Sequence, residues 1–100
     1  MATRMDAIQQ TVADYYEVKL RDLKSHVRNT WLSLPRMVAM YLARKLTRAS
    51  YRVIGQWFGG RDHSTVMKAL RKVEALRVKD LSIDHDVAVI TKRLRELEPA

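Results

Sequence analysis

The stretch that decides the fold is SYRVIGQWFGGRDHSTVMKALRKVEALR, residues 50–77. Ser50 is placed to cap a short helix, and Gly59-Gly60 to end it, because glycine accepts the left-handed backbone that closes helices. Asp62 then stands where the N-cap of a second helix belongs, and apolar residues recur after it at i, i+3, i+4 and i+7 spacing. A short helix, a tight glycine turn and a longer helix together predict a helix-turn-helix over this stretch.

Aromatic residues near this stretch are assigned mainly to the core. Trp57 and Phe58 lie at helical spacing with Ile54, so we expect them to be buried rather than to stack on a ligand. Trp31 is left open, because it could fill the core or contact a nucleic acid.

The rest of the chain also shows helical periodicity and no sustained period-two alternation, so strands are not expected. Ser33 followed by Pro35 predicts a helix start after a loop over 26–34. Asp84, with His85 and Asp86, resembles a cap that opens the last helix. The sequence predicts one all-α domain over 1–100, with five to six helices around a central helix-turn-helix. The helices expected outside 50–77 lie at about 4–17, as a short turn within EVKLRDLKS (17–25), from about 33 to 48, and from about 84 to 98.

Positive charge is concentrated in the middle of the chain. Between Arg36 and Lys72 there are nine Lys or Arg against one acid, Asp62, so this segment carries the whole formal net charge of +8. Solvated surfaces normally mix the two signs, and a block of one sign indicates a polyanionic partner. Nucleic acid is the favoured class, and an anionic membrane surface is disfavoured because no basic stretch has a broad exposed aromatic and leucine face.

Several other classes of protein are disfavoured by composition. The chain has no cysteine, so it has no disulfide framework or thiolate metal site. No apolar run approaches the roughly 18 residues of a membrane span, and the N-terminal MATRMDAIQQ lacks the apolar core of a secretory signal. We therefore expect a cytoplasmic protein associated with the nucleoid.

The chemistry at the start of the second helix suits base recognition. In a helix-turn-helix this end of the helix enters the major groove. The carboxylate of Asp62 can accept from a cytosine amino group, and the methyl of Thr65 can contact a thymine methyl, while His63 and Ser64 donate or accept. Cations flanking the groove, Arg44, Arg48 and Arg52, would contact phosphates without reading sequence.

Other functions for GGRDHST (59–65) fit less well. A plain capping role for Asp62 is the default reading and does not exclude base contact. The pattern lacks the lysine and the preceding strand of a phosphate-binding P-loop. The three histidines fall on separate elements without metal-ligand spacing, and neighbours at a helix start cannot align as a catalytic triad. We expect no enzyme activity, metal, cofactor or small-molecule substrate.

Three blocks resemble one family in order and spacing: IQQTVADYYEVKLRDL, PRMVAMYLARKLT and GGRDHSTVMKALRKVE. The family is the C-terminal DNA-binding domain of the bacterial replication initiator DnaA, and the resemblance covers about residues 5–77. It implies a Trp-repressor-like helical fold that binds double-stranded DNA at the DnaA box through both grooves.

The resemblance also implies roles for individual residues. Asp62, His63, Ser64 and Thr65 match the readers of the major groove and adjacent phosphates. Arg28 matches a loop arginine that enters the minor groove. The positions that match contacts to the DNA backbone are Arg36, Arg44, Thr47 and Ser50. The full set predicted to contact DNA is Arg28, Arg36, Arg44, Thr47, Ser50, Tyr51, Arg52, Arg61, Asp62, His63, Ser64, Thr65 and Lys68.

Two departures from the family pattern bear on base preference. Tyr51-Arg52 stands where the family usually has Leu-Pro, and the loop HVRNTWLSL keeps Arg28 but few other cations. The alternatives for function are a stand-alone DnaA-like regulator without an ATPase module and a helical adaptor that binds proteins. Without a zipper pattern, a monomer on a non-palindromic site is expected.

Overall fold

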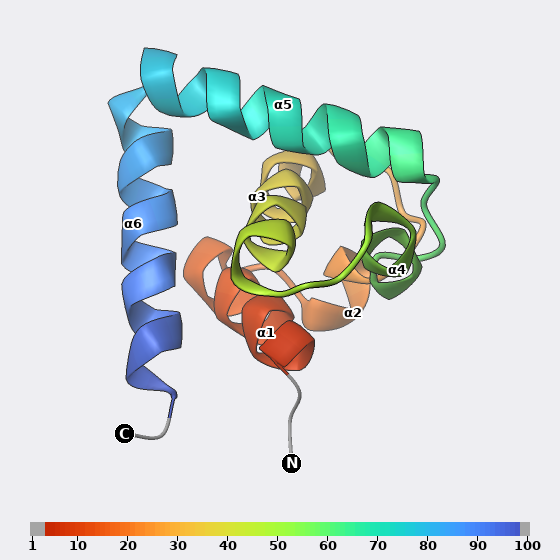
Figure 1. Ribbon diagram of the computed structural model, residues 1–100, viewed down its shortest axis with the longest axis horizontal. Coiled ribbons are helices and arrows are strands. Elements are labelled where there is room, and N and C mark those ends of the chain that lie inside the picture. The colour runs from red at the N-terminus through yellow and green to blue at the C-terminus, as the bar shows by residue number, and fades with distance from the viewer. Residues whose placement is uncertain (1–3, 99–100) are drawn as a thin grey trace.

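The computed structural model describes residues 4–98, which form six helices and, within that range, no strand (Figure 1). This confirms the all-α prediction. The helices are α1 (Arg4–Tyr16), α2 (Leu20–Leu23), α3 (Thr30–Leu46), α4 (Tyr51–Trp57), α5 (His63–Lys79) and α6 (Leu81–Glu96).

Helices α4 and α5 form the helix-turn-helix that the glycine turn predicts. The Ser50 hydroxyl accepts a hydrogen bond from the Val53 amide at 3.2 Å, which caps α4. Gly59 and Gly60 follow α4 with φ of 83° and 75°, the left-handed region in which glycine is favoured. The Asp62 carboxylate then accepts from the Ser64 amide and caps α5. The turn thus fixes where the second helix starts.

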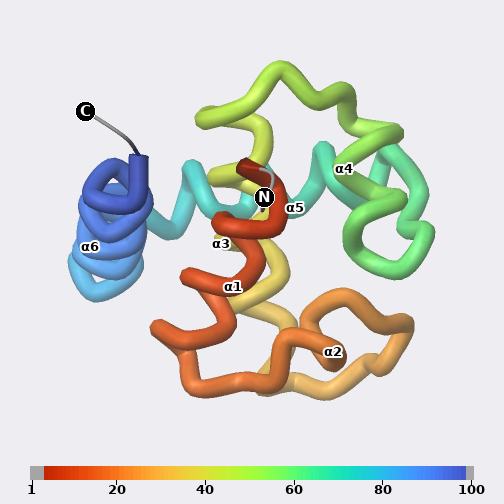
Figure 2. Tube along the Cα trace, turned by 90° about the horizontal axis from the view of Figure 1, so that it is seen from below, coloured from red at the N-terminus to blue at the C-terminus, as the bar shows by residue number. Residues whose placement is uncertain are grey.

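Helix α3 lies at the centre of the molecule. Helix α6 flanks α1 and α3 on one side, and α4 with the start of α5 lies on the other (Figures 1 and 2). Phe58 and Ile54 are fully buried, as their spacing predicts, whereas Trp57 is only partly buried against the core. Burial of a side chain of this size contributes about 1.5–3 kcal/mol, so the helix-turn-helix is anchored by its apolar face.

The start of α3 differs from the sequence prediction. The helix begins at Thr30 instead of at Ser33, and Pro35 lies inside it. Proline is tolerated best in the first turn, because further in it removes a helical hydrogen bond to the residue four positions earlier, here Trp31. Leu32 is fully buried, and this packing holds the first turn in place. Trp31 projects outward and is 63% exposed, so it does not fill the core.

The last helix also starts earlier than predicted. Asp80 caps it through the Ser82 amide at 3.0 Å, so Asp84 is not the cap. Asp84 instead pairs with Arg77 at 2.8 Å. Asp86 accepts hydrogen bonds from the hydroxyls of Tyr15 and Tyr16, at 2.5 and 3.0 Å. These contacts tie α6 to α5 and to α1.

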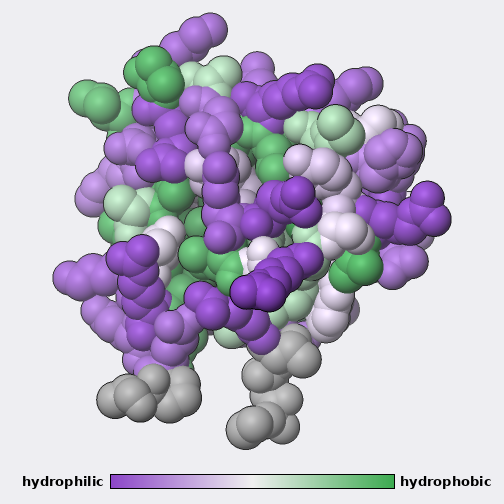
Figure 3. Space-filling model, in the orientation of Figure 1, coloured by the Kyte–Doolittle hydropathy of each residue, from purple (hydrophilic) through white to green (hydrophobic). Residues whose placement is uncertain are grey.

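Hydrophilic side chains predominate on the face shown in Figure 3. Within the described residues, no helix is long and apolar enough to cross a membrane.

Candidate nucleic-acid interface

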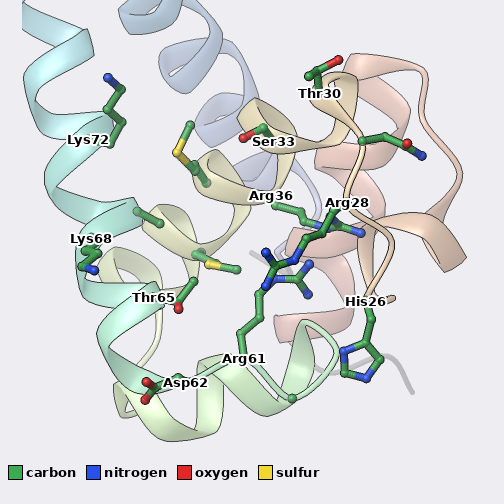
Figure 4. Close-up of a pocket in the computed structure, with 15 residues that line it drawn as sticks. His26, Arg28, Thr30, Ser33, Arg36, Arg61, Asp62, Thr65, Lys68 and Lys72 are labelled. Carbon is green, nitrogen blue, oxygen red and sulfur yellow. The ribbon is translucent and has the colours of Figure 1, made fainter.

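A basic groove lies between the first half of α5, the first half of α3 and the loop that joins α2 to α3 (Figure 4). Its lining is partly apolar, with Met37, Met40 and Ala69, and its Lys and Arg side chains outnumber its one acid, Asp62. The cationic and titratable groups that line the groove are His26, Arg28, Arg36, Arg61, Asp62, Lys68 and Lys72. Several of the residues predicted to contact DNA are therefore brought to one concave surface.

The start of α5 forms one end of this groove. Besides accepting from the Ser64 amide, Asp62 accepts from the Ser64 hydroxyl at 2.9 Å, and these two bonds hold the pKa of Asp62 below its usual range. The His63 ring nitrogen Nδ1 lies 3.0 Å from the same carboxylate. His63 and Thr65 are exposed, as is Lys68 one turn further along. The cap therefore leaves polar side chains of the first turn open to a ligand.

Arg28 and Arg61 approach each other in the groove from different elements (Figure 4). Arg28 is exposed on the α2–α3 loop. Arg61, in the turn before α5, is partly buried and donates from Nη1 to the carbonyls of Ser25, at 2.9 Å, and of Phe58. Burial, and then the charge of Arg28, lower the pKa of Arg61. Both side chains remain cationic at neutral pH, so the groove concentrates positive potential.

Arg36 is buried, contrary to what a DNA-backbone contact requires. It is 6% exposed, and its guanidinium donates to the backbone carbonyls of four residues in the preceding segment: Asp22, Leu23, Ser25 and Val27. Burial lowers its pKa, and the neighbouring Arg61 lowers it further. Arg36 is thus committed to holding the loop, and its contact with the DNA backbone stays a prediction that this burial disfavours.

A second cluster of predicted residues lies at the α3–α4 connection and not in the groove. The guanidinium of Arg44 donates to the Ala49 carbonyl at 3.0 Å and lies 4.3 Å from the ring centre of Tyr51. Thr47 donates to the Ala43 carbonyl at 2.6 Å and accepts from the Ala49 amide. Ser50 and Arg52 are exposed at the start of α4. Arg44 and Thr47 therefore shape the connection that presents Ser50 and Arg52.

The groove contains polar residues that the sequence did not place in the site, namely His26, Asn29, Thr30, Ser33 and Lys72. The sequence could have indicated Lys72, because it follows Lys68 by four positions and therefore lies on the same face of the helix. The others lie on the loop and first turn of α3, whose course the sequence did not predict. No group of three or more His, Asp or Glu within residues 4–98 could hold a metal ion.

Comparison with known proteins agrees with the helix-turn-helix of α4 and α5. The sequence model of the family described as bacterial dnaA protein helix-turn-helix matches residues 5–73, a range that covers α1 except its first residue, all of α2 to α4 and the first part of α5. The chain belongs to this DnaA family.

Individual relatives extend the match along the chain. The chromosomal replication initiator protein DnaA of Aromatoleum aromaticum is 50% identical over 91 residues, which are 91% of this chain and 19% of the relative. The protein of the same name from Caulobacter vibrioides is 46% identical over 91 residues, again 19% of its length. This chain thus spans about a fifth of the DnaA proteins that it matches.

A solved structure agrees as well. The crystal structure of a DNA replication initiation factor superposes with a TM-score of 0.76 at 37% identity, over 91% of this chain and 29% of that chain. The similarity to a DNA replication initiation factor therefore extends to the three-dimensional fold.

Proposed function

We propose that this DnaA-family chain binds double-stranded DNA at DnaA-box-like sites, as in the recognition of a replication origin. The observation that carries the proposal is that the open first turn of α5 and the exposed Arg28 lie on one basic groove. The first turn of α5 would enter the major groove, and Arg28 would enter the adjacent minor groove, where narrow A·T-rich sequence attracts arginine.

Different side chains are suited to contact bases or phosphates. Asp62, His63 and Thr65 carry the acceptors, donors and methyl group that base edges require. Lys68, Lys72 and Arg52 supply charge for phosphates, which fixes orientation and contributes affinity without reading sequence. Ser50 and Ser64 lie at helix starts, where the helix dipole favours a phosphate oxygen.

The proposal includes the setting of the protein. Residues 1–100 act as one DNA-binding domain, binding as a monomer without a cofactor or an enzymatic step, on the nucleoid in the cytoplasm. We place the domain within a replication initiator, because the DnaA relatives that it matches carry that name. A stand-alone regulator would use the same groove. The natural gene distinguishes the two possibilities, because an initiator gene would encode this domain fused to an ATPase and a regulator gene would encode it alone.

Fluorescence anisotropy with a DnaA-box duplex and a scrambled duplex of the same composition tests the function. We expect tighter binding to the box at near-physiological salt and a steep loss of affinity for both duplexes as salt rises. Equal affinity for the two duplexes at near-physiological salt would show that binding is only electrostatic. It would refute sequence-specific recognition.

A further inference from the structure

The α2–α3 loop that carries Arg28 is joined to the helix-turn-helix through the backbone of one residue, Ser25. The Ser25 carbonyl accepts from Arg61 Nη1 at 2.9 Å and from Arg36 Nη2 at 3.1 Å. Arg61 belongs to the turn of the helix-turn-helix, and Arg36 belongs to α3. Two cations from different elements thus converge on one carbonyl of the loop.

Gly59 brings the same two segments into backbone contact. A Cβ atom at Gly59 would lie 2.9 Å from both the carbonyl carbon and the carbonyl oxygen of Ser25, closer than side chains tolerate. Arg61 is itself fixed to α4, because its amide donates to the Gly55 carbonyl at 2.9 Å. The turn and the loop are therefore seated directly against each other, with no intervening side chain at Gly59.

The loop also stabilises itself around Ser25. The Ser25 hydroxyl donates to the Asp22 carbonyl at 2.8 Å and accepts from the Val27 amide at 3.1 Å. Arg28 follows immediately after Val27. A short path of hydrogen bonds thus leads from the turn before α5 to Val27, the residue that precedes Arg28.

We propose that Arg61 acts as a positioning residue that clamps the Arg28 loop to the helix-turn-helix, so that the two reading elements are held at a fixed separation before DNA arrives. This inference rests on the proposed function and adds an assignment within it, since Arg61 acts through Arg28 and does not itself contact DNA. Because the loop is already ordered in the free protein, less conformational entropy is lost when DNA binds.

The like charges in the groove fit this arrangement. The repulsion between Arg28 and Arg61 is offset in the free protein by the carbonyls that Arg61 contacts, and a phosphate in the groove would offset it further. The clamp therefore holds Arg28 in a cationic environment that becomes more favourable when a polyanion binds.

The first test uses the free protein. Arg61→Lys keeps the charge but replaces the planar fork of donors by a single ammonium group. Arg71→Lys, on the exposed face of α5, is the matched control. We expect backbone NMR order parameters of residues 26–28 near 0.85 in the wild type and in the control, and falling toward about 0.6 in Arg61→Lys. Unchanged order parameters in Arg61→Lys would overturn the clamp. If Arg61→Lys does not fold, Arg61→Gln, which retains a donor, takes its place.

The second test is a double-mutant cycle on DNA affinity. We expect Arg61→Lys to weaken binding to the box by about tenfold alone, and by less than about twofold when Arg28 is already alanine, because positioning a missing side chain has no effect. The salt dependence should stay unchanged, since the charge is kept. Losses that simply add would show that Arg61 contacts DNA independently and would overturn the inference. If the wild type fails to distinguish the box from the scrambled duplex, the proposed function fails, and the order parameters still decide whether the clamp exists.

Discussion

At the residue scale, Asp62 combines a structural role with an exposed position at the proposed site. Its carboxylate caps α5 by accepting from the Ser64 amide and hydroxyl, while the side chain remains open to the groove. Capping and recognition are compatible because a carboxylate has two oxygens and several lone pairs. Replacing it therefore affects both helix stability and base preference.

The capping bonds give Asp62 a measurable pH dependence. Because hydrogen bonds from Ser64 lower its pKa in the folded protein, its contribution to stability is present above the unfolded pKa of about 3.9 and is lost as pH falls through the folded value. Asp62→Asn keeps a capping oxygen but does not titrate. We expect the difference in unfolding free energy between wild type and Asp62→Asn to be constant above about pH 5 and to shrink below about pH 4. Urea unfolding across this range measures it, and a difference that persists unchanged to the most acidic pH would contradict the assignment.

Lys68 provides a second prediction at this scale, on salt dependence. Replacing one phosphate-contacting lysine by alanine should weaken binding to the box and to the scrambled duplex alike and make the slope of log affinity against log salt shallower by about one unit. Lys92→Ala removes the same charge from the exposed surface of α6, outside the groove, and serves as the control. Equal effects of the two substitutions would mean that only net charge matters.

Arg36 shows the limit of sequence reasoning for single residues. The resemblance placed it at a DNA-backbone contact, and its position in the basic block agreed with that role. Its burial depends on four carbonyls of a loop whose path no local pattern encodes. By contrast, the cap at Asp62 was predictable because capping depends only on neighbouring residues.

At the element scale, the sequence predicted the helix-turn-helix better than the helices around it. Gly59-Gly60 and the two caps are local signals, and the structure confirms them. The sequence predicts later starts for α3 and α6 than the structure has, because Pro35 and Asp84 resemble start signals. The buried residues Leu32 and Ile83 extend the apolar stripes one turn earlier, and their burial outweighs the misleading signals.

The two glycines of the turn should differ when changed to alanine. Both have positive φ, which costs a residue with a side chain about 1–2 kcal/mol. At Gly60 the nearest atom to a new Cβ is a ring carbon of His26 at 3.8 Å, an ordinary contact, whereas at Gly59 the Ser25 backbone is too close. Urea unfolding should therefore show a loss of about 1–2 kcal/mol for Gly60→Ala and a clearly larger loss for Gly59→Ala. Equal losses would contradict the close seating of the turn on the loop.

At the scale of the whole molecule, the fold separates the basic block into two surfaces. Arg61, Lys68 and Lys72 join Arg28 in the groove, whereas Arg44 and Arg52 lie at the α3–α4 connection. The charge count predicts a polyanionic partner, and the family resemblance predicts which positions contact DNA. The proximity of Arg28 and Arg61 could be seen only in the tertiary structure, since the two residues lie on separate elements joined through Ser25.

The most direct test of the account is an NMR titration of the labelled protein with a DnaA-box duplex and, separately, with the scrambled duplex. We expect the largest amide shift changes for the box at residues 26–30, 50–52 and 61–68, with little change along the exposed face of α6. The scrambled duplex should give smaller changes at 62–65. Changes centred on α6, or identical changes with both duplexes, would contradict the claim that the groove and the start of α5 read DNA sequence.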